Sequence, residues 1–115
     1  MLIRNQRKTL LLNYSNSDII DTMEIDRGYI VACLNSKGTY TLGKYSQKEK
    51  VIKVLDMIQE AYADAELIPM IVPNIGKMFA EAPASKENEL LGEAIGKALM
   101  NKMVFQMPED SEVEA

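Results

Sequence analysis

The spacing of apolar residues changes at Ser46, and this change limits the folds open to the chain. Before this point, apolar residues alternate with polar ones or form short runs, as they do in β-strands. Beyond it, apolar residues such as Val51, Leu55 and Ile58 recur every three or four positions, which is typical of an amphipathic helix. We therefore predict an α+β fold in which one long helix, over about 47–65, packs against a sheet.

Five short segments before Ser46 have the pattern of strands. They are residues 2–3, 9–14, 22–26, 29–34 and 39–42. Within 22–26, apolar Met23 and Ile25 alternate with polar neighbours, which indicates a half-buried strand. The segment 35–38 fits a hairpin loop with Gly38 in a left-handed conformation. Because the connections are short, we predict an antiparallel β-meander sheet of about five strands.

Residues 67–101 depart from this pattern, and we predict that they form a helical appendage inserted into the domain. Pro69, Pro73 and Pro83 interrupt the segment, and proline inside a helix removes a hydrogen bond and clashes with the preceding turn. A short helix can follow Pro73, and Ser85 can cap another.

The rest of the chain closes the predicted domain. A last strand over about 102–107, ended by a proline, gives a single α+β domain at 1–108. Residues 109–115 carry four acids and no base, so we expect an acidic disordered tail there.

The composition argues against several kinds of function. Histidine is absent and Cys33 is the single cysteine, which excludes His-dependent acid–base catalysis and zinc sites built on imidazole or on several thiolates. The net charge of −4 argues against a dedicated nucleic-acid binder. No apolar run approaches the ~18 residues of a membrane span. We expect a cytoplasmic protein with no cofactor, no metal and no membrane contact.

The stretch GTYTLGKYS, from Gly38 to Ser46, has the glycine and lysine spacing of a phosphate-binding loop. Such a loop lies between a strand and a helix, and it needs a serine or threonine directly after the lysine. In this chain Tyr45 follows Lys44 instead. We interpret the stretch as a strand, a turn and a helix start, in which Glu49 completes a capping box with Ser46. Weak anion binding at the helix start remains open.

Two further groups of charged residues carry weaker hypotheses. Four carboxylates lie between Asp18 and Asp26, and Glu24 and Asp26 could share a strand face and hold a divalent metal or act as an acid–base pair. Arg4, Arg7 and Lys8 are the candidates for contact with an anion or a nucleic acid.

The helical insertion carries the predicted partner-binding residues. Five of the eight methionines lie in the second half of the chain, and methionine-rich apolar surfaces adapt to protein partners. The alternative is that these methionines fill an irregular core. The predicted partner-binding residues are Met70, Ile71, Met78, Phe79 and Leu91. Gly92 and Gly96 add a hint of close helix–helix contact or of a homodimer through 67–101.

Three short stretches form a set. They are Ile3-Arg4-Asn5-Gln6, then Leu42-Gly43-Lys44-Tyr45-Ser46 running into a helix, and Val104-Phe105-Gln106-Met107-Pro108-Glu109. This set resembles small uncharacterised proteins of phages and mobile elements in Gram-positive bacteria, which combine a β-meander, a covering helix after L-G-x-Y-S and a terminal strand ending in M-P-E. The likeness covers 1–66 and 102–110, while 67–101 reads as an insertion.

The resemblance implies a mobile-element setting but supplies no catalytic residues. Small phage proteins of this kind often act by binding, including binding that blocks host defence systems such as CRISPR nucleases. We therefore predict a non-catalytic protein-binding module, an anti-CRISPR-like inhibitor acting by steric occlusion. The alternatives are a structural homo-oligomer, a carboxylate enzyme with a divalent metal, and a nucleic-acid-contacting protein.

Overall fold

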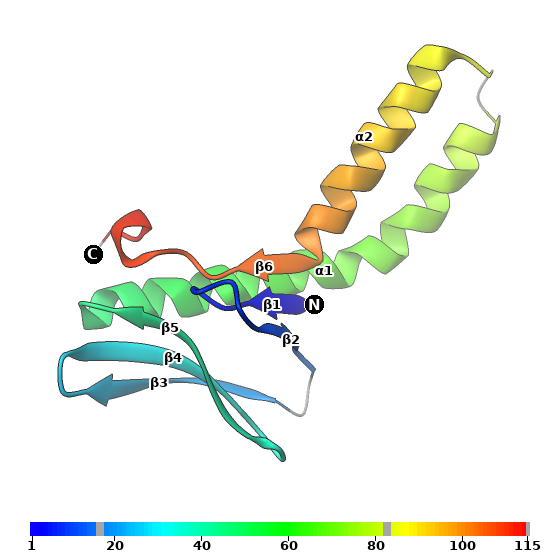
Figure 1. Ribbon diagram of the computed structural model, residues 1–115. Coiled ribbons are helices and arrows are strands. Elements are labelled where there is room, and N and C mark those ends of the chain that lie inside the picture. The colour runs from blue at the N-terminus through cyan, green and yellow to red at the C-terminus, as the bar shows by residue number, and fades with distance from the viewer. Residues whose placement is uncertain (16–17, 82–83, 115) are drawn as a thin grey trace.

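The fold consists of two small sheets, one long helix that contacts both, and a second helix that folds back on the first (Figure 1). A computed structural model describes residues 1–15, 18–81 and 84–114, and it leaves out the side chains of residues 72, 75, 76, 79 and 102. The prediction of an α+β fold is confirmed.

One sheet is an antiparallel meander of β3 (Ile19–Ile25), β4 (Gly28–Asn35) and β5 (Gly38–Tyr45). Strand β4 lies in the middle, and its residues Val31 and Cys33 are fully buried against α1. Gly38 opens β5 with a φ of 144°, which is the left-handed conformation predicted for the hairpin.

The other sheet has the order β2-β1-β6 and brings distant parts of the chain together. Strand β1 (Leu2–Arg4) pairs antiparallel with β2 (Leu11–Asn13) and parallel with β6 (Val104–Gln106). The single five-stranded sheet that we predicted is therefore wrong. In a five-stranded meander β3 would pair with β2. In the described residues β2 instead pairs with β1 alone, β1 takes β6 as its other neighbour, and the strands divide into two sheets of three.

Helix α1 spans Lys48–Glu81, well beyond the predicted end near residue 65. It continues through Pro69 and Pro73, where the backbone hydrogen bonds to the carbonyls four residues earlier are lost. Figure 1 shows α1 changing direction along its length, as proline inside a helix produces. The prolines therefore bend the helix without ending it.

Helix α2 (Lys86–Lys102) runs back antiparallel to the second half of α1 (Figure 1). Its N-cap is Ser85, whose hydroxyl accepts a hydrogen bond from the Asn88 amide at 3.1 Å, as the sequence predicted. We call the unit formed by residues 67–81 and 86–102 the helical hairpin. It projects from the sheets and extends the molecule to 60 Å in its longest dimension.

Residues 109–114, the described part of the acidic C-terminal segment, are ordered, contrary to the disordered tail expected over 109–115. A short 3₁₀-helix, η1 (Asp110–Glu112), packs at the start of α1, and Val113 is buried in the core. The segment is held because Asp110 finds a cation and two hydrogen-bond donors there, which composition alone does not reveal.

The core lies between the two sheets and the first half of α1. It is apolar, and Tyr45 and Leu42 are among its most deeply buried side chains. Its other buried members are Ile3, Val31, Cys33, Val51, Val54, Ile58, Met107 and Val113.

Candidate functional site

Of the exposed large apolar side chains that the structure describes, the largest group lies on the helical hairpin. Ile68 is only 5% exposed, at the base of the hairpin, while Met70 and Met78 on α1 and Met100 on α2 are each 70% exposed. Leu67 and Leu90 are exposed as well. Exposed apolar side chains mark an interaction site where they gather into one contiguous patch.

The structure places four of the five predicted partner-binding residues on this exposed surface. Met70, Ile71, Met78 and Leu91 are all exposed. The side chain of the fifth, Phe79, lies outside the described part of the structure.

The exposed residues do not form a single stripe on α1. Leu67, Ile71 and Met78 are separated by four and seven residues, so they share one face of the helix. Met70 directly precedes Ile71, and adjacent residues of a helix do not face the same side. Met70 therefore lies outside the stripe formed by Leu67, Ile71 and Met78. The sequence missed Leu67 because the helix was expected to end before it.

Gly96 does not make the close helix contact that the Gly92-x-x-x-Gly96 spacing suggested. Apart from its chain neighbours and the backbone of its own helix, a Cβ built on Gly96 would meet no heavy atom within 4 Å in the described structure. The glycine therefore leaves space beside α2, and close packing within the hairpin does not explain it.

A second feature is the joint between β5, α1 and the C-terminal segment. The Tyr45 hydroxyl donates to the Pro108 carbonyl at 2.7 Å, and the Ser46 amide and hydroxyl donate to the Asp110 carboxylate at 2.8 and 3.1 Å. The Lys50 ammonium lies 3.4 Å from the same carboxylate. The joint thus ties together the two motifs, L-G-x-Y-S and M-P-E, on which the resemblance rests.

The pKa shifts of Tyr45 and Asp110 agree with these hydrogen bonds. Burial, followed by the nearby charges of Glu109, Asp110 and Glu112, raises the pKa of Tyr45 and keeps its hydroxyl a donor. The Ser46 backbone amide, then its hydroxyl and Lys50, lower the pKa of Asp110 despite some desolvation. The Ser46 hydroxyl thus donates to Asp110, whereas the sequence predicted that Ser46 would form a capping box with Glu49.

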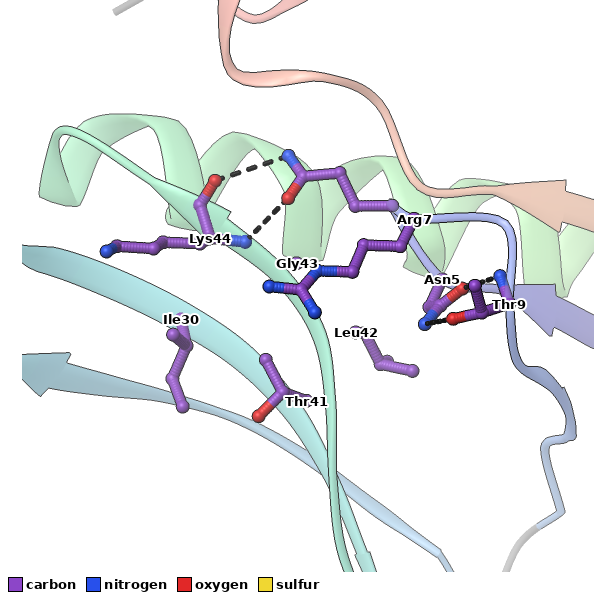
Figure 2. A pocket seen from close by; sticks show the side chains of 9 residues that line it. Asn5, Arg7, Thr9, Ile30, Thr41, Leu42, Gly43 and Lys44 are labelled. Carbon is purple, nitrogen blue, oxygen red and sulfur yellow. Dashed lines mark hydrogen bonds between the residues drawn. The ribbon is translucent and has the colours of Figure 1, made fainter.

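A third feature is an open cleft of about 400 Å³ between the first turn of the chain and β5 (Figure 2). It is walled by Arg7 and Lys44, two basic residues from distant parts of the sequence. The remaining lining residues are Asn5, Gln6, Thr9, Ile30, Thr41, Leu42 and Gly43. The stretch resembling a phosphate-binding loop forms β5 here and is no loop.

Strand β5 contains a bulge where it lines the cleft. Val31 pairs with Gly43 but Ala32 pairs with Thr41, so Leu42 is an extra residue. The Leu42 carbonyl accepts from the Gln6 amide at 2.8 Å. The Gln6 side chain then accepts from the Lys44 amide at 2.9 Å and donates to the Lys44 carbonyl at 3.2 Å. One glutamine thus joins the two sheets along the edge of β5.

The remaining candidates from the sequence are not brought together into a site. Glu24 lies in β3 and Asp26 in the turn that follows, so they do not share a strand face. Within the described residues, no three cysteine or acidic side chains lie close enough to hold a metal ion. Cys33 is buried, and burial, with a smaller effect of Asp18, raises the pKa of its thiol, which makes it a poor nucleophile.

Comparison of the chain with protein-family models, with curated proteins and with solved structures gave no match. In the part of the chain that the structure describes, neither helix combines the length and apolar character needed to cross a membrane.

Proposed function

We propose that the protein is a non-catalytic, cytoplasmic protein-binding module of a phage or mobile element, and that the helical hairpin is its partner surface. The observation that carries the proposal is the hairpin itself, which projects from the sheets and exposes Met70, Ile71, Met78 and Leu91. Burying such side chains against a partner gains about 1.5–3 kcal/mol for each fully covered one.

The phage setting and the role as an inhibitor of a host defence protein rest on the sequence resemblance. A hairpin that extends the molecule to 60 Å suits steric occlusion, because it can reach into a partner while the sheets hold its base. No step of this function requires a catalytic residue.

The proposal is tested by affinity capture from a host lysate with matched variants. Ile71→Glu and Met78→Glu place charges on one face of α1 without touching the buried core. We expect the double variant to lose the captured protein. Leu11→Glu is the control, because Leu11 is 56% exposed but lies on β2, away from the hairpin. Equal capture by both variants would show that the hairpin is not the interface.

The second candidate function is a structural homo-oligomer formed through the same hairpin. It is favoured by charge balance, since residues 67–103 contain four lysines and four glutamates, and a neutral surface does not repel a copy of itself. Light scattering over a range of protein concentrations separates the two functions. A mass that stays that of one chain argues against the homo-oligomer.

A further inference from the structure

We propose that the cleft between the first turn and β5 binds a small phosphate monoester, with Arg7 holding the phosphate group. This site is separate from the helical hairpin and does not depend on the function proposed for it. The proposal rests on four properties of the cleft: its charge, its rigid wall, its remaining hydrogen-bond donors and its size.

The cleft is positively charged within an acidic protein. Arg7 and Lys44 both line it, and no carboxylate does, although the chain as a whole has a net charge of −4. The one ion pair found among the described residues joins Lys50 to Asp110, so it leaves both cleft cations available. A phosphate monoester carries a charge of about −1.5 to −2 at neutral pH, which matches two cations better than a carboxylate does.

The turn that carries Arg7 is fixed by its own hydrogen bonds. The Asn5 side chain is buried, accepts from the amides of Thr9 and Leu10 at 2.8 and 3.0 Å, and donates to the Thr9 hydroxyl at 3.1 Å. Lys8 has a φ of 62°, a conformation that costs energy for a residue with a side chain. Such strain is often kept where a backbone must present a binding group, and here it lies at the residue directly after Arg7.

The two cations differ in how they face the cleft. Figure 2 shows the Arg7 side chain reaching toward β5 and ending near Gly43, whereas the Lys44 side chain extends away from it. The guanidinium is therefore placed to make two parallel hydrogen bonds to a phosphate. Lys44 contributes mainly through its charge.

The other lining groups suit the rest of such a ligand. The Thr9 hydroxyl accepts from Asn5 and retains its hydrogen for donation. Thr41 also lines the cleft, and the half-buried Ile30 offers an apolar wall. The volume of about 400 Å³ falls within the roughly 300–1,000 Å³ of small-molecule sites. The cleft is thus large enough for an organic group in addition to the phosphate.

The probes are phenyl phosphate, inorganic phosphate and benzoate, added at constant ionic strength to the isotope-labelled protein and followed by NMR. We expect saturable shifts of the Thr9, Thr41 and Gly43 amide signals, strongest with phenyl phosphate. Arg7→Gln should weaken its binding roughly tenfold or more, as expected for loss of charge-assisted hydrogen bonds. Lys44→Gln should weaken it less. Arg27→Gln is the matched control, an exposed arginine outside the cleft.

Four results would overturn the proposal. The first is the absence of saturable shifts up to about 10 mM phenyl phosphate, where even weak sites fill. The second is an equal effect of Arg7→Gln and Arg27→Gln. The third is benzoate binding as tightly as phenyl phosphate, which would assign the cleft to carboxylates. The fourth is a single-stranded oligonucleotide binding more tightly with a steep salt dependence, which would assign it to nucleic acid.

Discussion

At the scale of single residues, Gly43 and Tyr45 explain why the L-G-x-Y-S stretch is built as it is. They lie two positions apart in β5, so both point to the same face. A Cβ on Gly43 would come within 2.9 Å of the Tyr45 ring. The ring cannot move aside, because it is buried and its hydroxyl is bonded to the Pro108 carbonyl.

We therefore expect Gly43→Ala to lower the free energy of unfolding by about 1–3 kcal/mol, the usual effect of overpacking. Gly96→Ala is the comparison, because its Cβ meets nothing and alanine favours a helix by about 0.5–1 kcal/mol over glycine. Denaturation with urea measures both. A stabilising Gly43→Ala would mean that the Tyr45 ring does not lie where the structure places it.

At the scale of elements, β3 shows how far sequence pattern reaches. The alternation over 22–26 correctly predicted a strand, but Met23 and Ile25 do not face α1. The register with β4 decides this, because Thr22 is paired with the buried Val31 and directly paired residues share a face. Met23 and Ile25 therefore lie on the opposite side, where Ile25 is exposed.

Local sequence pattern does not reveal which distant residues meet, and this explains the other differences between the predicted and the observed fold. The strands, the start of α1 and the Ser85 cap follow from local patterns, and so they could be predicted. The partition into two sheets depends on β6 reaching β1, and the order of the C-terminal segment depends on Lys50 and Ser46 meeting Asp110. Both are contacts between distant residues, as is the meeting of Arg7 and Lys44 at one cleft.

The C-terminal segment gives a prediction about pH. The pKa of Asp110 is lowered in the folded protein, so its carboxylate contributes stability above the ordinary carboxyl pKa of about 3.9 and loses it as the pH falls through the lower folded-state value. Asp110→Asn should therefore be less stable than the unmodified protein at neutral pH, and this difference should shrink below about pH 4.

Urea denaturation at several pH values between about 3 and 7 measures that difference. Glu114→Gln is the control, because it removes an exposed acid from the same segment. If the two variants respond to pH in the same way, the contacts of Asp110 with Ser46 and Lys50 do not stabilise the protein.

At the scale of the whole molecule, the hairpin makes the protein unusually extended. The radius of gyration of the Cα atoms is 17.6 Å, whereas a compact chain of this length would have about 13 Å. The core lies entirely in the sheets, the first half of α1 and the C-terminal segment.

We expect replacement of residues 69–101 by a short glycine–serine linker to leave that core folded. Solution scattering should then show the radius of gyration falling from near 17.6 Å to the compact range, and cooperative urea unfolding should persist. An unfolded product would show that the hairpin is needed to stabilise the sheets. The free energy of unfolding of the Ile71→Glu and Met78→Glu variant would then have to be compared with its loss of capture.

The pairing of β1 with β6 has a consequence for synthesis of the protein. Leu2 lies opposite Val104, and a ribosome adds about 5–20 residues per second. Strand β1 therefore leaves the ribosomal exit tunnel on the order of 5–20 s before β6, which is its second neighbour in the sheet. Until then β1 and β2 are a two-stranded hairpin, which is marginally stable in water. A stalled ribosome or a nonsense codon upstream of β6 would thus release a chain with an open strand edge, which quality-control proteases and chaperones can recognise.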